Sequence, residues 1–300
     1  MPGPMHADEF DIDEALVRRL LAAQFPAWTQ LGLKRMPSTG TDNAIFRLGP
    51  DLAVRLPRRP AADGQAEKDA LWLPRLAPHL PVAIPLPVAL GEPSEAFAWR
   101  WSVCPWLPGA PPAIGAIADP VGLAKDLAGF IRALRVIDPA GGPPPGRHNF
   151  GRGVPLVQRD QRTREAIGQL RGIIDTGAAS AAWETALAAP VHTGAPNWIH
   201  GDICGGNVLV VEGRLSGVID FGGLAVGDPA CDLIVAWNLL PTEGRDVFRA
   251  ELAADDAAWA RGRGWALSIA LLQLPYYNET NPGLAANATA TIAEILRDAA

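Results

Sequence analysis

Apolar residues recur with a helical period near the start of the chain. Ile12, Leu16 and Leu20 fall on one face of a predicted helix that spans Asp11–Phe25. Asp11 is the expected N-cap of this helix, and Glu14 lies at the position of a capping-box glutamate. The pattern therefore predicts an amphipathic helix ahead of the first strands.

The following segments alternate between apolar and polar residues, as strands with one buried face do. The strand-like runs are Leu31–Met36, Ala44–Leu48, Leu52–Leu56, Val82–Leu90 and Ala96–Val103. Gly49-Pro50-Asp51 predicts a hairpin turn, and Asp63–Leu76 has a helical pattern. We expect a mainly antiparallel sheet with a long helix laid on it.

The composition changes near Trp106, where helical patterns begin to dominate. The predicted helices are Val121–Val136, Leu156–Ile173, Ala178–Ala189 and most of 229–298, with a break at 275–278. A Gly/Pro-rich loop occupies 138–154, and a short β region lies at 197–219. The predicted fold class is α+β, with a small antiparallel β-rich lobe (1–105) and a larger, mainly helical lobe (106–300).

Composition and charge exclude several classes of protein. The 300 residues are 48% apolar and 19% charged, as in ordinary globular proteins. The net charge of −6 argues against a nucleic-acid partner. The three cysteines form no C-x-x-C pair and indicate free thiols in a reducing compartment. The longest apolar stretch, Trp265–Leu274, is too short to span a bilayer. We expect a cytoplasmic monomer or homodimer without a membrane partner.

The stretch 198–232 carries the clearest chemistry. Two predicted strands, Val208–Val211 and Leu215–Ile219, flank a tight Glu212-Gly213 turn. This hairpin is expected to bring Asp202, Asn207 and Asp220 to one edge. Carboxylate and amide oxygens are hard ligands that suit Mg²⁺ bound to phosphates.

The same residues follow a kinase pattern. His200-Gly-Asp202, then Asn207 and Asp220-Phe-Gly222, match the catalytic loop H-x-D-x-x-x-x-N and the metal-binding D-F-G. Asp202 is the expected base, and Asn207 and Asp220 are the expected Mg²⁺ ligands. His200 joins the predicted catalytic set as a group that orients the loop, not as an acid or base. The competing interpretation is a set of turn-forming residues, which does not explain three residue types at fixed spacings.

The segment resembles the aminoglycoside phosphotransferase/choline kinase family, which has H-G-D where protein kinases have H-R-D. Asp228-Pro-Ala-Cys-Asp232 is similar to the D-P-x-x-D of that family. Only five residues separate Gly222 from Asp228, which leaves no room for a protein-kinase activation segment. The resemblance implies a bilobal protein-kinase-like fold and Mg²⁺-dependent transfer of the γ-phosphoryl of ATP or GTP to a small-molecule hydroxyl.

The predicted small lobe contains candidate phosphate-binding residues. The polar turn at 37–43 offers Ser38, Thr39, Gly40 and Asn43 for close approach to phosphates. Arg55 stands where the family has a lysine, and the two residues are not interchangeable. Since the chain has only three lysines, compositional drift is an alternative explanation for this arginine.

Two further candidates complete the nucleotide side. Glu67 is the expected helical partner of Arg55, and Asp69 is the alternative. Trp106 belongs to the predicted link between lobes, which would offer backbone groups to the nucleobase; Pro105 has no N–H to give.

The acceptor is left open by the sequence. The candidate pocket residues, each of which also suits core or rim packing, are Trp237, Asn238, Trp265, Tyr276, Tyr277 and Asn278. An aminoglycoside or related antibiotic competes with a metabolic amino alcohol, sugar or natural product. A weakly active nucleotide-binding protein is a further alternative, supported only by Arg55.

Overall fold

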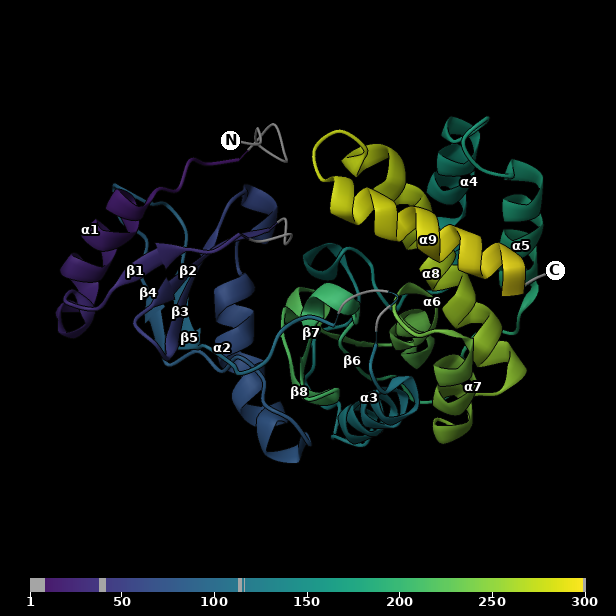
Figure 1. Cartoon of the computed structure of the whole chain (residues 1–300), viewed down its shortest axis with the longest axis horizontal. Helices are drawn as coiled ribbons and strands as arrows, with labels where there is room; N and C mark the ends of the chain where they lie inside the picture. The colour runs from purple at the N-terminus through teal and green to yellow at the C-terminus, as the bar shows by residue number, and fades with distance from the viewer. Residues whose placement is uncertain (1–8, 38–41, 113–114, 116, 299–300) are drawn as a thin grey trace.

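A computed structural model of the chain has two lobes, a smaller one built on a sheet and a larger helical one (Figure 1). It describes residues 9–37, 42–112, 115 and 117–298. Each lobe contains a cluster of buried apolar side chains. The predicted α+β class, with a small antiparallel sheet lobe and a larger, mainly helical lobe, is confirmed.

The small lobe is organised by a five-stranded antiparallel sheet with the order β1-β2-β3-β5-β4. Its strands are β1 (Leu33–Arg35), β2 (Asn43–Leu48), β3 (Leu52–Pro57), β4 (Ala89–Gly91) and β5 (Trp101–Pro105). The prediction of a strand over Val82–Leu90 is wrong for all but its end. Prolines 81, 85 and 87 lack the N–H that a ladder needs, so regular pairing begins only at Ala89.

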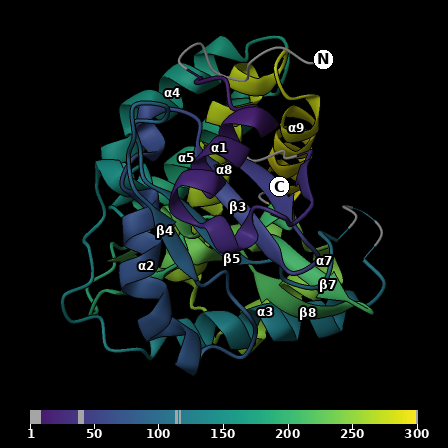
Figure 2. The same cartoon turned by 90° about the vertical axis from the view of Figure 1, so that its left-hand side faces the viewer.

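The two faces of the sheet meet different helices. Phe46, Val54 and Val103 are register partners whose side chains join the same buried cluster as helix α1 (Glu14–Gln24). Figure 2 shows α1 in front of the sheet. Because neighbouring strand residues point to opposite faces, Arg55 projects to the other side, toward helix α2 (Gln65–Leu76).

Helix α1 begins later than the sequence predicts. The N-cap is Asp13, whose Oδ1 accepts a hydrogen bond from the Leu16 N–H at 2.7 Å. Ile12 is buried in the small-lobe core, so the chain enters the helix only after it. Glu14 then lies in the first turn and pairs with Arg18 at 2.8 Å instead of closing a capping box.

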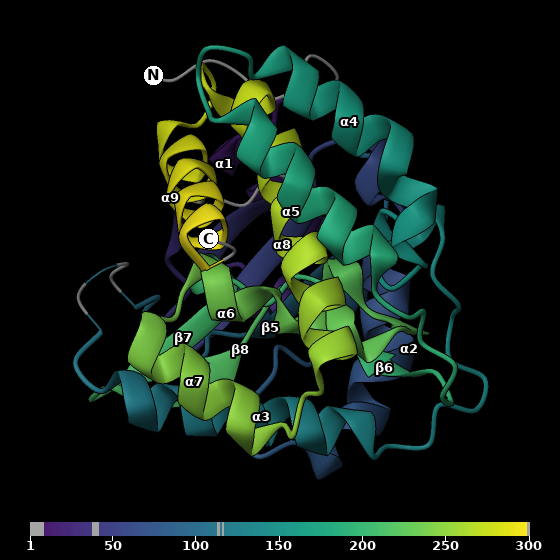
Figure 3. The same ribbon diagram turned by 90° about the vertical axis from the view of Figure 1, so that its right-hand side faces the viewer.

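The large lobe packs around one central helix, α8, which contacts α4, α5 and α9 (Figure 3). Its helices are α3 (Pro120–Arg135), α4 (Asp160–Gln169), α5 (Thr176–Ala188), α6 (Val235–Asn238), α7 (Thr242–Glu251), α8 (Asp256–Tyr277) and α9 (Pro282–Asp298). No helix in the described part of the chain is long and apolar enough to cross a membrane.

Two helix predictions in the large lobe need correction. The segment predicted as one helix over Leu156–Ile173 is a 3₁₀ turn, Leu156–Arg159, followed by α4, which ends at Gln169. Helix α8 continues through Pro275 and ends at Tyr277, so the break begins only at Asn278, the last residue of the predicted 275–278 segment.

The β segments of the large lobe hold the predicted hairpin. Strands β7 (Val208–Val211) and β8 (Arg214–Val218) pair antiparallel, while β6 (Asn197–Ile199) pairs with β9 (Ala225–Gly227). The two turn residues between β7 and β8, Glu212 and Gly213, both have positive φ. Such a turn matches the twist of the strands, as the sequence predicts.

Candidate active site

Asp202 follows strand β6 in a loop whose backbone is held by two buried side chains. Asp232 accepts hydrogen bonds from the N–H groups of His200, at 2.9 Å, and Gly201, at 2.7 Å. His200 Nδ1 accepts from the Asp202 N–H at 3.2 Å, and its Nε2 lies 3.1 Å from the Ile219 carbonyl oxygen. Since a carbonyl only accepts, the proton sits on Nε2. His200 therefore orients the loop.

Asn207 links the catalytic loop to the hairpin. Its side-chain N–H₂ donates to the Asp202 carbonyl oxygen at 2.9 Å and to the Asp202 carboxylate at 3.2 Å. Its backbone carbonyl accepts from the Ile219 N–H at 2.9 Å. Asp220, the next residue, therefore lies beside Asn207, as the hairpin predicts.

Asp220 is held in an unusual backbone conformation. Its φ of 63° lies in the left-handed region, which few residues other than glycine adopt. The turn that follows, Phe221–Gly223, packs the Phe221 ring against His200 at a centroid distance of 4.6 Å. The conformation turns the half-buried Asp220 carboxylate toward Arg55, whose Nη2 is 3.6 Å away.

The catalytic loop and the Asp220 turn cross at two glycines. A Cβ on Gly223 would lie 2.6 Å from the His200 carbonyl oxygen, and one on Gly201 would lie 2.5 Å from the Gly223 carbonyl oxygen. Real side chains do not fit at these distances. The absence of side chains here lets the Asp202 and Asp220 segments approach each other.

Arg55 is the buried cation of the small lobe. Its Nη1 lies 3.1 Å from the Asp69 carboxylate, and only 10% of the Arg55 side chain and 1% of the Asp69 side chain are exposed. Burial alone would lower the pKa of Arg55, but the charges of Asp69 and Asp220 raise it above its ordinary value.

The prediction that Glu67 pairs with Arg55 is wrong, and the alternative, Asp69, is the partner. Glu67 instead lies 3.1 Å from Arg100, and both of these side chains are substantially exposed. Two residues along a helix correspond to a turn of about 200°, so the two carboxylates leave α2 on opposite sides. The side that faces the sheet belongs to Asp69.

Lys68 connects α2 to the large lobe. Its Nζ donates to the Gly222 carbonyl oxygen at 2.7 Å. Burial lowers the pKa of this ammonium group to about 8, although Asp69 and Asp220 oppose that effect. The helix that supplies the partner of Arg55 is therefore also attached to the Asp220 turn.

The remaining nucleotide-side predictions have mixed outcomes. Ser38, Thr39 and Gly40 lie outside the described residues, whereas Asn43 is buried at the start of β2. The Trp106 N–H donates to the Asp51 carbonyl oxygen at 2.7 Å. Since that bond takes up the Trp106 N–H, another backbone group of the link would have to bind the nucleobase.

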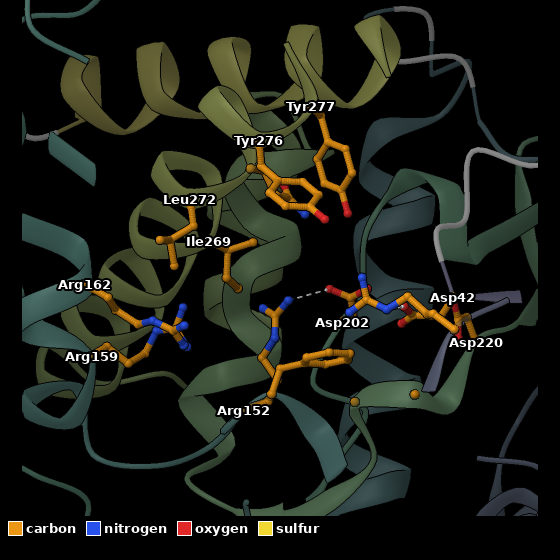
Figure 4. Close-up of a pocket in the computed structure, with 15 residues that line it drawn as sticks. Asp42, Arg152, Arg159, Arg162, Asp202, Asp220, Ile269, Leu272, Tyr276 and Tyr277 are labelled. Atoms are coloured by element: carbon orange, nitrogen blue, oxygen red, sulfur yellow. Dashed lines mark hydrogen bonds and ion pairs between the residues drawn. The ribbon is translucent and has the colours of Figure 1, made fainter. Parts of the chain in front are cut away.

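A cavity of about 360 Å³ opens beside Asp202 and Asp220 (Figure 4). One side carries Asp42, Asp202 and Asp220. Burial and the nearby negative charge of Asp220 raise the pKa of Asp42 to about 6. The other lining residues are Arg59, Phe150, Arg152, Arg159, Arg162, Gly222, Gly223, Ile269, Leu272, Gln273, Tyr276 and Tyr277.

The predicted acceptor residues divide into two groups. Tyr276 and Tyr277 line the cavity, and Asn238 lines a smaller hollow of about 30 Å³ that also touches Asp202. Trp237 and Trp265 are buried in the large-lobe core, so their packing interpretation is confirmed.

Arginines in the cavity wall are the residues that sequence reasoning missed. Arg152 pairs with Asp202 at 3.2 Å, and Arg159 and Arg162 line the same wall. The loop that carries Arg152 is fixed by Asn149, whose side-chain N–H₂ donates to the Arg152 carbonyl oxygen at 2.9 Å and to the Gly223 carbonyl oxygen at 3.2 Å. No local motif marks these positions.

The two-lobed fold is that of small-molecule kinases. The chain belongs to the phosphotransferase enzyme family, whose model matches residues 35–265. This match confirms the resemblance to the aminoglycoside phosphotransferases seen in the sequence. A comparison with curated protein sequences gives no match.

Solved structures with the same fold include several phosphotransferases. An aminoglycoside 2″-phosphotransferase in complex with GDP and kanamycin superposes with a TM-score of 0.75 at 19% identity, covering 94% of this chain and 98% of the other. A GDP complex of a wild-type aminoglycoside 2′-phosphotransferase gives 0.76 at 19%, covering 96% and 99%. The macrolide 2′-phosphotransferase MphH from Brachybacterium faecium gives 0.58 at 24%, covering 94% and 97%.

Proposed function

We propose that this protein transfers the γ-phosphoryl group of ATP or GTP to a hydroxyl group of a small molecule. The observation that carries the proposal is the hairpin, which brings Asp202, Asn207 and Asp220 together beside a cavity. In this proposal residues 1–105 hold the nucleotide, and residues 106–300 supply the base and the acceptor pocket.

The side chains at this edge fit a magnesium ion. The Asn207 N–H₂ is taken up by Asp202, which leaves the amide oxygen for a cation. Asp220 adds a carboxylate, and Asp42 adds negative charge nearby. Among the residues that the structure describes, no group of three or more His, Cys, Asp or Glu side chains is arranged to hold a metal. Two protein ligands plus phosphate oxygens and water are a usual set for Mg²⁺, which would neutralise phosphate charge.

The chain's own residues have distinct tasks in the transfer. The acceptor hydroxyl oxygen forms a bond to the γ-phosphorus while the bond from that phosphorus to the β–γ bridging oxygen breaks. Asp202 takes the hydroxyl proton, and the nucleoside diphosphate leaves. Arg55 stabilises negative charge on the phosphates, and Asp69 holds Arg55 in place.

The related structures support a nucleotide as phosphoryl donor. These complexes contain GDP, ADP or ATP as bound nucleotides, and kanamycin, gentamicin or streptomycin as bound antibiotics. These complexes are 18–21% identical to this chain, so the similarity establishes a shared fold but does not identify the acceptor.

Two substitutions test the proposed roles. Asp202→Asn removes the base and should lower transfer by about 10²-fold or more with little change in nucleotide affinity. Asp220→Ala should abolish the dependence of nucleotide binding on Mg²⁺. Asp246→Asn, at an exposed position in α7, is the matched control. The assays are a screen of hydroxylated amines, aminoglycosides and sugars with ATP or GTP, and calorimetric nucleotide titration. Near-normal turnover of Asp202→Asn, or unchanged Mg²⁺ dependence of Asp220→Ala, contradicts the assignment.

A further inference from the structure

The cavity wall opposite the carboxylates is basic. Arg152, Arg159 and Arg162 line it, from the loop after Asn149, the 3₁₀ turn Leu156–Arg159 and helix α4. Figure 4 shows the ends of Arg159 and Arg162 extending to the same part of the cavity, on the far side of Asp202 from Asp220. Three cations therefore share a wall of the space in which an acceptor would bind.

Arg159 is a built feature of this wall, not a flexible surface side chain. Only 6% of the residue is exposed. Its Nε donates to Ser268 Oγ at 3.0 Å, and its guanidinium lies over the Trp265 ring, 4.7 Å from the centroid. Thr163 Oγ1 lies 2.7 Å from Ser268 Oγ and donates to the Arg159 carbonyl oxygen. The Trp265 ring thus covers one face of the Arg159 guanidinium, and Ser268 accepts a hydrogen bond from its Nε.

This buried cation has no acidic partner in the part of the chain that the structure describes. Buried arginines are ordinarily paired, and none of the ion pairs among residues 9–37, 42–112, 115 and 117–298 involves Arg159 or Arg162. Burial, together with the positive charges of Arg152 and Arg162, lowers the pKa of Arg159 to about 9. An anion bound between these groups would supply the missing counter-charge.

Arg152 also lacks a partner for one of its N–H groups among the described residues. Its Nη2 pairs with Asp202 at 3.2 Å, whereas its Nη1 is buried without a hydrogen-bond partner in the described part of the chain. Only 12% of this side chain is exposed. A buried N–H without an acceptor is costly, so this atom also favours an incoming oxygen ligand.

We propose that the acceptor carries an oxyanion (a carboxylate, phosphate or sulfate) that binds to the Arg152–Arg159–Arg162 wall while its hydroxyl reaches Asp202. The inference rests on the proposed phosphoryl transfer and narrows its substrate class. A polycationic aminoglycoside would bring further positive charge to this wall, whereas a hydroxylated acid satisfies it. The oxyanion also competes with Asp202 for Arg152, and so leaves the base available for the hydroxyl proton.

The first arm of the test measures anion binding without turnover. Protein saturated with ADP or GDP and Mg²⁺ is titrated calorimetrically with sulfate at constant ionic strength. Arg162→Gln is the variant, since this exposed arginine can be removed without opening the core. Arg171→Gln removes the same charge at an exposed position outside the cavity wall. Arg162→Gln should weaken sulfate binding about tenfold, and Arg171→Gln should bind as the unaltered protein does. Equal binding by both variants, or no binding, overturns the proposal.

The second arm compares three acceptors of one shape with different charge: glucose, glucosamine and glucuronate. Phosphoryl transfer should favour glucuronate, and Arg162→Gln should raise its KM about tenfold while kcat changes little. If the unaltered protein and Arg162→Gln both prefer glucosamine, the inference is overturned but phosphoryl transfer still stands. If no acceptor is phosphorylated and nucleotide binding is independent of Mg²⁺, the proposed function fails, and sulfate binding alone decides the anion site.

Discussion

Helix α2 offers a paired test of which carboxylate supports Arg55. Asp69→Asn removes one charge and keeps the shape. The amide oxygen can still accept the hydrogen bond that Gln65 donates at 2.6 Å, while the N–H₂ takes the place of the oxygen that accepts from Arg55. The substitution leaves the Arg55 guanidinium buried with a single remaining acidic neighbour, Asp220, at 3.6 Å. Glu67→Gln is the same chemical change two residues earlier on the same helix.

The burial of each ion pair sets the loss of unfolding free energy expected for each variant. Removing one partner of a buried ion pair costs about 3–5 kcal/mol, and the remaining attraction of Asp220 places Asp69→Asn near 3 kcal/mol. Glu67 is 44% exposed and its partner Arg100 is 33% exposed, so Glu67→Gln should cost at most about 1 kcal/mol. A loss of 1 kcal/mol lowers the midpoint of thermal unfolding by about 2–4 °C. The midpoint should therefore fall by about 6–12 °C for Asp69→Asn and by less than about 4 °C for Glu67→Gln.

Thermal unfolding followed by circular dichroism and urea titration measures both variants against the unaltered protein. Equal losses for the two variants, or a larger loss for Glu67→Gln, would refute the assignment of Asp69 as the partner of Arg55. A rise in stability for Asp69→Asn would show that the buried charges are not coupled as the distances indicate.

Three further outcomes are expected. In Arg55→Lys a single ammonium group replaces the two guanidinium nitrogens that contact Asp69 and Asp220, so kcat/KM should fall about tenfold. A rise in kcat/KM would favour compositional drift as the origin of Arg55. Gly223→Ala pushes a methyl group into a carbonyl oxygen of the catalytic loop and should abolish transfer, whereas Gly168→Ala in α4 has open space and should retain it. Comparable turnover of the two variants contradicts the close crossing. Burial raises the pKa of Cys204 to about 12, so dithionitrobenzoate at pH 8 should modify this thiol only after unfolding, and rapid labelling of the native Cys204 would show otherwise.

The hairpin and its three polar residues were predictable because the signal is local. Strand, turn and strand occupy a short stretch, and the turn chemistry at Glu212-Gly213 fixes which residues meet at its open end. The antiparallel sheet was predictable for the same reason, since alternation sets which face of β3 carries Arg55.

The errors come from information that the chain order does not contain. The choice between Glu67 and Asp69 depends on which side of α2 faces the sheet, and that side is set by packing. The basic wall depends on the path of the Gly/Pro-rich loop, which Asn149 pins to the Asp220 turn. Among 23 arginines, no spacing distinguishes the ones that end in the cavity.

Lys68 and Asp69 are neighbours on one helix, yet they reach into different lobes. Asp69 forms an ion pair with Arg55 of the sheet. Lys68 donates a hydrogen bond to the Gly222 carbonyl oxygen, in the turn that follows Asp220. If the lobes swing relative to each other, at least one of these contacts must lengthen. The helix therefore sets the distance between Arg55 and Asp220. Under the proposed function, any opening of the lobes would also separate the cation expected at the phosphates from the acid expected at the metal.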